Sequence, residues 1–280
     1  MIDLHTHSTA SDGTLSPCEL VNYAAEKNIG VLALTDHDTI EGLAEATVAA
    51  KNAKIQFIPG IELHIAWPTG EFHLLGLGIK SISQELVKII DLLQKGRKKR
   101  NLEIISRMQE AGIDIKITDI KTTNAKTIGR PHIATWMVEQ KIVKNHQHAF
   151  DRYLAKGRPF FVERKGASLD ESIGAITQSG GVPVLAHPLS LYVSWGKMEG
   201  VLQNLYERGI QGLEAWHPAA RVVECERLEK LARHIGFFIT AGSDFHGKTI
   251  RPDRAIGKTA GGKTIDDIFW TEELKPALEK

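Results

Sequence analysis

The sequence predicts an α/β fold in which a barrel of parallel β/α units is interrupted by a helical insertion. Short apolar runs such as Val31–Leu34 alternate with helical patterns along most of the chain, which is typical of strands covered on both faces. Each of these runs ends in histidine or carboxylate residues. Strand patterns are missing between about residues 98 and 165. We therefore expect a first barrel part over 1–97, a helical cap over 98–165 and a second barrel part over 166–280.

Length and composition are those of a large soluble domain. The chain has 280 residues, of which 42% are hydrophobic and 25% charged, so it can bury a sizeable core. No apolar run approaches the roughly 20 residues that span a bilayer, and histidines stand where a signal peptide would be apolar. Cys18 and Cys225 are too far apart in sequence to suggest a cysteine zinc site or a disulfide framework. We expect a cytoplasmic protein with no membrane segment and no obligate protein partner.

Charge is distributed unevenly along the chain. The segment from Lys95 to Lys165 contains 17 Lys and Arg against 7 Asp and Glu, a net charge of +10. The whole chain carries only +1, so the remainder carries −9. A basic segment of this kind is either ordinary solvated surface or a site for a polyanionic substrate, and the sequence leaves both interpretations open.

The first expected strand presents two histidines. Ile2 and Leu4 alternate with His5 and His7, so a period of two places the apolar pair on one face and both imidazoles on the other. Two imidazoles at a strand end make half of a metal site. A helix is then predicted to begin at Pro17, because proline is favoured at the first helical position, where its missing N–H costs no hydrogen bond.

Two further apolar runs end in candidate ligands. Val31–Leu34 is followed by a polar run that contains His37, and Gln56–Ile61 is followed by Glu62. Both runs have the length of buried parallel strands.

A hairpin and a long helix lead into the insertion. Pro68–Gly70 predicts a turn, and the return strand Phe72–Leu75 carries His73. A long amphipathic helix starts after Ser83 and ends in the basic cluster Lys95–Arg100.

The insertion is expected to be helical, and strand–helix alternation resumes after it. The short helices predicted within it cover 102–108, 131–139 and 146–155. Ser168 and Glu171 form the sequence pattern of a capping box for a helix that ends at Gln178. Three strands are then predicted at 182–186, 212–217 and 237–241. The polar residues that follow or end them are His187, His217, Asp244 and His246.

The C-terminal tips of parallel strands in a β/α barrel converge on one face, so the polar tips predict a single cluster. Isolated histidines are usually ordinary surface or core residues, and we interpret five in that way: His64, His132, His146, His148 and His234. Six imidazoles at strand ends need a shared purpose: His5, His7, His37, His73, His187 and His246. Histidine and carboxylate ligands without cysteine suit Mn, Fe or Zn.

These motifs carry a resemblance to a known family. They are H-x-H with the downstream Asp12-Gly13, Leu34–Asp38, Gly60-x-Glu62, His73, Ala186-His187-Pro188 and Ser243-Asp244-x-His246, with Gly129–His132 and Gly157–Pro159 in the insertion. The chain resembles the PHP (polymerase and histidinol phosphatase) superfamily from end to end. Within it, the chain is most similar to stand-alone phosphoesterases of the TrpH/YciV type. The resemblance implies a distorted seven-unit, TIM-like β/α barrel that holds two or three divalent metal ions.

The resemblance also implies which residues hold the metals. A first ion would be held by His5, His7, Glu62 and Asp244. Glu62 would bridge to a second ion held by His73 and His187, and a third ion would be held by Asp12, His37 and His246. Manganese is the metal expected, with Fe, Zn or Mg as alternatives. Asp36 and Asp38 would support the ligands, and the expected cations for substrate phosphate are Arg130, His217 and Arg158.

The activity implied by the resemblance is hydrolysis of a phosphate ester. A metal-bound hydroxide would attack phosphorus, so no side-chain nucleophile is needed. The substrates implied are nucleotides, nucleoside 3′,5′-bisphosphates that lose the 3′-phosphate, and short 5′-phosphorylated RNA trimmed from its 5′ end. The residues alone support only a phosphate ester. A histidinol-phosphate phosphatase and a non-catalytic metal-binding partner of a polymerase remain alternatives.

One motif suggests a different class of protein. Gly257–Thr264 fits the P-loop pattern G-x-x-x-x-G-K-T, which is typical of ATP-binding proteins. A P-loop joins a buried strand to a helix, and only 16 residues follow Thr264. We therefore interpret this segment as a loop before a helix near Ile265.

Overall fold

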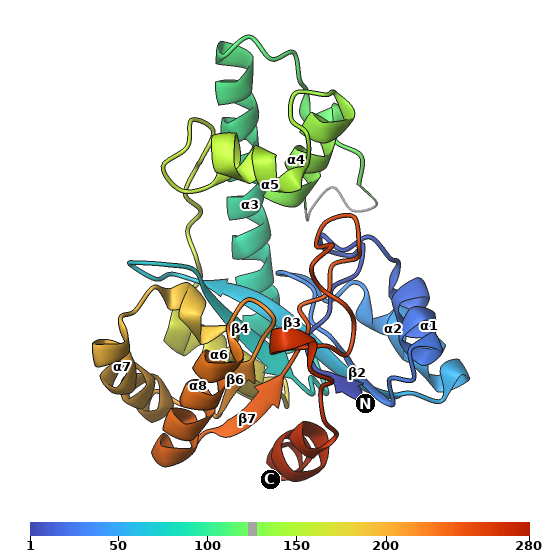
Figure 1. Ribbon diagram of the computed structural model, residues 1–280, viewed down its shortest axis with the longest axis vertical. Coiled ribbons are helices and arrows are strands. Elements are labelled where there is room, and N and C mark those ends of the chain that lie inside the picture. The colour runs from blue at the N-terminus through green and yellow to red at the C-terminus, as the bar shows by residue number, and fades with distance from the viewer. Residues whose placement is uncertain (123–127) are drawn as a thin grey trace.

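The computed structural model describes residues 1–122 and 128–280 and contains one seven-stranded sheet in the order β1 to β7 (Figure 1). The strands are β1 Ile2–Asp3, β2 Val31–Leu34, β3 Gln56–Ile65, β4 Phe72–Leu77, β5 Val182–Leu185, β6 Gly212–Trp216 and β7 Phe238–Ala241. All neighbouring strands are parallel except β4, which is antiparallel to β3 and β5. Thr6 forms a parallel bridge with Phe245, so the sheet nearly closes on itself. The expected distorted α/β barrel is confirmed.

The predicted hairpin at Pro68–Gly70 is confirmed, but its strands are longer than the sequence indicates. The ladder between β3 and β4 runs from the pair Gly60 and Leu77 to the pair Ile65 and Phe72. Glu62 therefore lies within β3 rather than beyond its tip, whereas His73 lies within β4 as expected. Continuous backbone pairing with a partner strand extends each strand past its apolar run, and this pairing is not visible in either run alone.

Helices surround the sheet. They are α1 Pro17–Glu26, α2 Leu43–Ala53, α3 Gln84–Glu110, α4 Arg130–Glu139, α5 His146–Ala149, α6 Leu169–Gln178, α7 Trp195–Glu207, α8 Val222–Ile235 and α9 Lys275–Leu278. Figure 1 shows α1 and α2 on one side of the barrel and α6, α7 and α8 on the other. None of the helices in residues 1–122 and 128–280 is long and apolar enough to cross a membrane.

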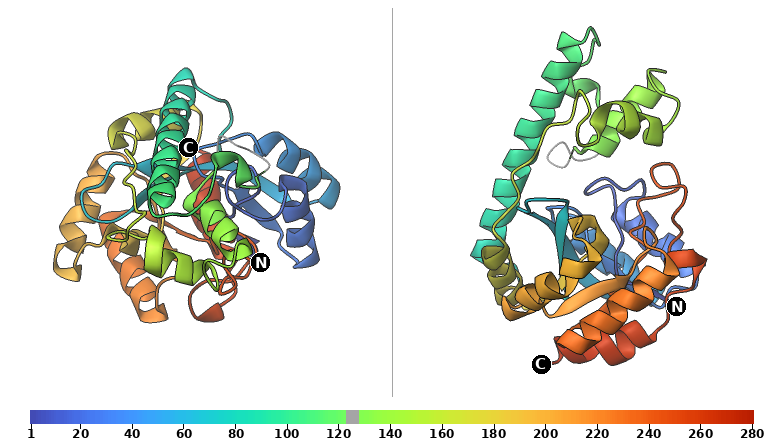
Figure 2. Two further views of the ribbon diagram at one scale, coloured as in Figure 1. Left: turned by 90° about the horizontal axis from the view of Figure 1, so that it is seen from above. Right: turned by 60° about the vertical axis from the view of Figure 1, so that its left-hand side comes forward.

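The long helix α3 connects the barrel to the insertion (Figure 2). Its first half packs Leu86 and Leu93 into the barrel core, whereas Ile104 and Met108 pack into a separate core made by the insertion. The separate helix predicted over 102–108 is therefore wrong, because no helix-breaking residue interrupts α3 after the basic cluster. The expected boundary between residues 97 and 98 lies inside α3, and the three-part division stays a prediction.

Two local predictions need correction. Ser168 is the N-cap residue of α6, but its side chain makes no capping hydrogen bond, so the predicted capping box is absent. The last helical region starts later than Ile265, with a π-helical segment at Phe269–Leu274 followed by α9.

The segment Gly257–Thr264 is not a P-loop. Lys258 and Thr264 form an isolated antiparallel bridge, and the short turn between them is a 3-10 turn at Ala260–Gly262. The Lys263 ammonium lies 4.9 Å from the centre of the Trp216 ring. A P-loop requires a buried strand directly before it and a helix N-terminus directly after it. Within residues 128–280, no strand leads into this turn, and no helix begins at its end.

Candidate metal centre

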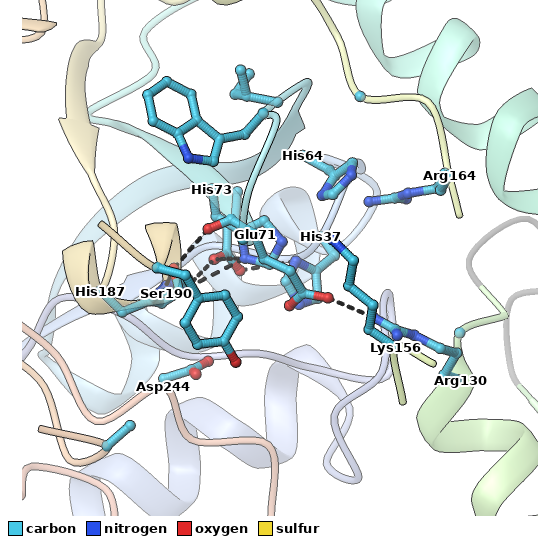
Figure 3. Close-up of a pocket in the computed structure, with 18 of the residues that line it drawn as sticks. His37, His64, Glu71, His73, Arg130, Lys156, Arg164, His187, Ser190 and Asp244 are labelled. Atoms are coloured by element: carbon cyan, nitrogen blue, oxygen red, sulfur yellow. Dashed lines mark hydrogen bonds and ion pairs between the residues drawn. The ribbon is translucent and has the colours of Figure 1, made fainter. Parts of the chain in front are cut away.

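The nine predicted ligands lie together at one end of the barrel. His5 and His7 follow β1, His37 follows β2, and the others come from β3, β4 and the segments after β5 and β7, with Asp12 in the first loop. Most of them line a cavity of about 1020 Å³ that is also lined by Arg130, Lys156 and Arg164 of the insertion. Figure 3 shows these basic side chains pointing toward the histidines.

The carboxylate of Glu62 is the centre of the cluster. Its Oε2 lies 3.3 Å from both His5 Nε2 and His7 Nε2, and 2.9 Å from His37 Nδ1. Its Oε1 lies 2.9 Å from His73 Nδ1 and 3.1 Å from His187 Nε2. Glu62 is fully buried, and the two oxygens point toward different sets of imidazoles.

Two more carboxylates complete the cluster. Asp244 Oδ1 lies 3.1 Å from His7 Nε2 and 3.3 Å from His246 Nδ1. Asp12 Oδ1 lies 3.3 Å from His246 Nε2 and 4.0 Å from His37 Nε2. Every carboxylate is therefore shared between imidazoles that come from different segments of the chain.

Three groups of these residues could each hold an ion, since their donor atoms lie within 4.8 Å of one another. The groups are His5, His7, Glu62 and Asp244; His37, Glu62 and His73; and His7, Asp12, His37 and His246. His187 is outside these groups, but its Nε2 is 3.3 Å from His73 Nδ1. Glu62 belongs to two groups, so its carboxylate could contribute a ligand to two ions.

The arrangement of the donor atoms is better explained by a bound metal than by hydrogen bonds among these side chains. Several are fully buried and have no hydrogen-bond partner among the described residues: His5 Nε2, His7 Nδ1, His7 Nε2, Asp12 Oδ1 and Glu62 Oε2. Buried polar atoms without a partner are rare in folded proteins and need an explanation such as an ion. A set of imidazole and carboxylate donors without sulfur suits Zn, Mn or Fe.

Comparison with known proteins decides the family. The PHP domain model matches residues 3–157. The chain belongs to the PHP family. It is 32% identical to a 3′,5′-nucleoside bisphosphate phosphatase of Chromobacterium violaceum over 98% of this chain and 93% of the relative. It is 34% identical to a 5′-3′ exoribonuclease of Haemophilus influenzae over 87% of this chain and 89% of the relative.

A solved structure has the same fold. It is a Bifidobacterium adolescentis protein described as a metal-dependent phosphoesterase, with a TM-score of 0.86, 27% identity and coverage of 98% of this chain and 95% of that chain. The resemblance to the PHP superfamily seen in the sequence motifs is therefore confirmed over the barrel and the insertion.

A buried carboxylate missed by the sequence analysis orients two histidines of this PHP site. Glu214 Oε1 lies 2.9 Å from His5 Nδ1, and its Oε2 accepts the backbone N–H of His187 at 2.8 Å. Such a contact fixes which ring nitrogen of His5 faces the cluster. The available signal was a single carboxylate within the otherwise apolar run at 212–216.

Two other aspartates hold the backbone around the ligands. Asp3 accepts hydrogen bonds from the backbone N–H groups of Ser243 and Gly257 at 3.0 and 2.7 Å, and burial raises its pKa to about 6. Asp36 accepts from Ser8 and Ser11 hydroxyls at 2.6 and 2.5 Å. These contacts tie the loops before and after the ligands to the barrel. The predicted supporting role of Asp36 agrees with this geometry.

Asp38 belongs to a second, basic cluster beside the candidate metal ligands. Its Oδ2 accepts from Arg97 Nη2 at 2.6 Å and from Arg164 Nη1 at 2.5 Å. Burial alone would raise the pKa of Asp38, but the two guanidiniums outweigh it and hold that pKa well below its ordinary value. Arg100 is also buried and donates to the amide oxygen of Asn101 at 2.9 Å. Arg97 and Arg100 were not singled out from the sequence, although both fall on the apolar stripe of α3.

The three predicted phosphate-binding residues have different positions. Arg130 lines the cavity and forms an ion pair with Glu71 at 2.7 Å. His217 also lines it, but burial lowers its pKa to about 4, so at pH 7 it is a neutral imidazole rather than the expected cation. Arg158 is exposed and is not part of the cavity wall, whereas Arg164 is.

One histidine interpreted as ordinary lies in the cavity wall. His64 is in β3, two residues after Glu62, and its ring is 5.5 Å from the ring of His73. Its Nδ1 is buried without a hydrogen-bond partner among the described residues. Residues two apart in a strand point to the same face. Since Glu62 was predicted to face the cluster, the sequence could have placed His64 on the same side.

Proposed function

We propose that this PHP-family protein removes the 3′-phosphate from nucleoside 3′,5′-bisphosphates and trims short 5′-phosphorylated RNA from its 5′ end. One observation carries the proposal: a single cavity contains both the histidine–carboxylate cluster and a group of buried guanidiniums. A substrate with two separated anionic groups suits such a cavity. The two relatives above are named for these two activities.

The nine clustered residues are assigned to two or three divalent ions, with manganese as the expected metal. Ions bound there would lower the pKa of water and polarise phosphoryl oxygens, which is the chemistry of phosphate ester hydrolysis. Glu214 holds His5 in position, and Asp3 and Asp36 hold the loops that carry the histidine pair and Asp244. The chain thus keeps its ligands in a fixed arrangement before substrate binds.

The basic cluster is assigned to the second phosphate. Four guanidiniums lie on this side of the cavity, those of Arg97, Arg100, Arg130 and Arg164. Three of them are paired with two carboxylates: Arg97 and Arg164 with Asp38, and Arg130 with Glu71. The excess of positive charge favours a bound anion, and buried guanidiniums bind phosphate with paired hydrogen bonds.

The two clusters are close enough to act on one small substrate. A Cβ atom built on Gly129 would lie 3.3 Å from Arg97 Nη1 and 3.6 Å from Asp12 Oδ2. The first turn of α4 therefore brings the basic cluster next to the metal ligands. A phosphate held by the arginines would orient the reacting phosphate, so its loss should lower kcat as well as raise KM.

Steady-state kinetics with Mn²⁺ on adenosine 3′,5′-bisphosphate and adenosine 5′-monophosphate tests the proposal. We expect kcat/KM to be at least tenfold higher for the bisphosphate, with adenosine 5′-monophosphate as the product. Equal values would contradict the two-cluster assignment. A 5′-phosphorylated RNA trinucleotide is tested in the same assay. If the protein hydrolyses none of the three compounds, the proposed activity itself is contradicted.

The histidinol-phosphate alternative is not favoured by the cavity. Histidinol phosphate carries an ammonium group, and the cavity wall beside the candidate metal ligands is rich in guanidiniums. Like charges at short range oppose binding. Histidinol phosphate therefore serves as a negative control in the same assay.

A further inference from the structure

One aromatic ring in the cavity wall has no role in the proposed hydrolysis. The aromatic side chains of phenylalanine, tryptophan and tyrosine that line the cavity in the described part of the chain are Trp67, Phe150, Phe161 and Tyr192. Phe150 and Phe161 flank the guanidinium of Arg130, with ring centres at 5.9 and 5.7 Å. Tyr192 is 76% exposed, the highest value among the exposed large hydrophobic residues. Its ring is available to a ligand that enters the cavity.

The backbone of Tyr192 is held in an uncommon conformation. It has φ +51° and ψ +41°, in the left-handed region that residues with a side chain seldom adopt. Tyr192 ends the 3-10 turn Pro188–Leu191, and its N–H donates to the carbonyl of Leu189 at 3.2 Å. Such a conformation persists only when surrounding contacts determine it, and it is common at ligand sites.

The hairpin between β3 and β4 supplies those contacts. The carbonyl of Leu191 accepts from Trp67 Nε1 at 3.2 Å and from Thr69 Oγ1 at 2.7 Å. The carbonyl of Ser190 accepts from the N–H of Glu71, and the Ser190 hydroxyl donates back to the Glu71 carbonyl, both at 2.8 Å. Figure 3 shows Ser190 and Glu71 side by side. The turn is thus fixed to the hairpin at two successive residues.

The hairpin also supports the ring itself. A Cβ atom at Gly70 would lie 2.8 Å from Tyr192 Cδ2 and 2.0 Å from the carbonyl oxygen of Ser190. Only glycine allows this close approach. One side of the ring therefore rests on the backbone at Gly70.

The same turn begins at a residue of the metal cluster. His187 Nε2 lies 3.1 Å from Glu62 Oε1, and His187 Nδ1 lies 2.9 Å from Ser190 Oγ. Tyr192 is five residues further along the chain, directly after the 3-10 turn Pro188–Leu191, and both residues line the same cavity. The turn therefore connects the metal cluster to the residue that presents the aromatic ring.

We propose that Tyr192 is the stacking platform for the nucleobase of the substrate. It would favour substrates that carry a base over those that do not, and it is separate from the histidine–carboxylate cluster and the arginine cluster. This inference rests on the proposed function and names the part of the cavity that recognises the nucleoside. Every nucleobase presents a flat π face, so stacking on one ring accepts all four bases. The rigid turn means that little side-chain freedom is lost on binding, because a tyrosine on a fixed backbone has few rotatable bonds.

The experiment compares Tyr192→Ala and Tyr192→Phe with the wild type on two substrates. One is adenosine 3′,5′-bisphosphate, and the other is 1-deoxyribose 3,5-bisphosphate, which keeps both phosphates and the sugar but has no base. Loss of base stacking on an aromatic ring corresponds to a change of about 5- to 150-fold. We expect the ratio of kcat/KM for the nucleotide to kcat/KM for the base-free compound to fall by this factor in Tyr192→Ala, mainly through KM. In Tyr192→Phe the ratio should stay within about twofold of the wild type.

Calorimetric binding of adenosine 3′,5′-bisphosphate in Ca²⁺ buffer separates this inference from the proposed function. Weaker binding by Tyr192→Ala, with Tyr192→Phe like the wild type, supports stacking even if the wild type hydrolyses neither substrate. An unchanged ratio and unchanged binding in Tyr192→Ala would overturn the inference while leaving hydrolysis intact. An equal loss on both substrates would also overturn it, because it would show that the residue only supports the turn.

Discussion

Glu71 of the barrel and Arg130 of the insertion form an ion pair of 2.7 Å across the wall of the cavity (Figure 3). Burial alone would raise the pKa of Glu71, but the Arg130 guanidinium outweighs it and the pKa falls to about 2. Arg130 is the first residue of α4, and Glu71 precedes β4. The pair therefore ties the helical insertion to the barrel at the edge of the proposed active site and directs one guanidinium toward it.

Arg130→Ala should lower kcat/KM for adenosine 3′,5′-bisphosphate while leaving the metal content unchanged. Removal of a cation that binds a buried substrate phosphate costs about 2–5 kcal/mol, which corresponds to a loss of one to three orders of magnitude or more. Steady-state kinetics and elemental analysis on the same preparation check this. Arg152→Ala, which removes an exposed arginine of the insertion, is the matched control. Wild-type kinetics in Arg130→Ala would show that the ion pair only holds the insertion in place.

His246→Ala should lose metal as well as activity. His246 Nε2 lies 3.3 Å from Asp12 Oδ1, and both residues belong to one of the three candidate ion sites. We expect elemental analysis of the purified variant to find about one ion per chain fewer than in the wild type. His234→Ala, on the exposed face of α8, should keep the wild-type content. Full activity of His246→Ala would contradict the assignment of the third ion.

Glu214→Gln should weaken metal binding without removing a ligand. The substitution keeps the shape of the side chain but removes the negative charge that holds His5 Nδ1 at 2.9 Å. Loss of such a supporting contact typically lowers metal affinity about 10- to 100-fold. Competition with a chelator of known affinity measures this, and Glu207→Gln on the exposed part of α7 is the control. Equal affinities in the two variants would mean that Glu214 does not act on the metal site.

Asp38→Asn should destabilise the fold at neutral pH, because it removes the buried negative charge that Arg97 and Arg164 share. Breaking a buried pair in this way costs about 3–5 kcal/mol. The pKa of Asp38 in the folded chain lies below its ordinary value of 3.8, so its contribution is present above about pH 4 and is lost as the pH falls below that value. Urea unfolding with chelator present should therefore show a large difference between variant and wild type at pH 7 and a smaller one at pH 3.

The control for this measurement is Asp170→Asn. Asp170 pairs with Arg208 at 2.8 Å on the protein surface, where ion pairs contribute little to stability. We expect its unfolding midpoint to match the wild type at both pH values. A difference between Asp38→Asn and wild type that does not change with pH would show that charge on Asp38 is not the cause.

Local pattern was enough to predict the barrel strands and the histidines that gather at one end of the barrel. An apolar run followed by histidine or carboxylate is encoded within a few residues, as at Val31–Leu34 with His37. The hairpin was predicted for the same reason, since Pro68–Gly70 is a turn signal in itself. The length of β3 was misjudged for a different reason: β3 extends to Ile65 because β4 pairs with it, and neither apolar run shows this pairing by itself.

The sequence by itself determined the α/β class, the histidines at the strand ends and the basic character of the insertion, because strand periodicity and charge are local properties. The full set of nine candidate ligands came from the resemblance to the PHP superfamily. Only the tertiary structure decided which charges face the site. It selected Arg97, Arg100 and Arg164 over the exposed Arg158, placed Glu214 against His5 and left Tyr192 exposed at the cavity wall. These relationships join segments that are far apart in sequence, and burial and pairing between such segments arise only when the chain has folded.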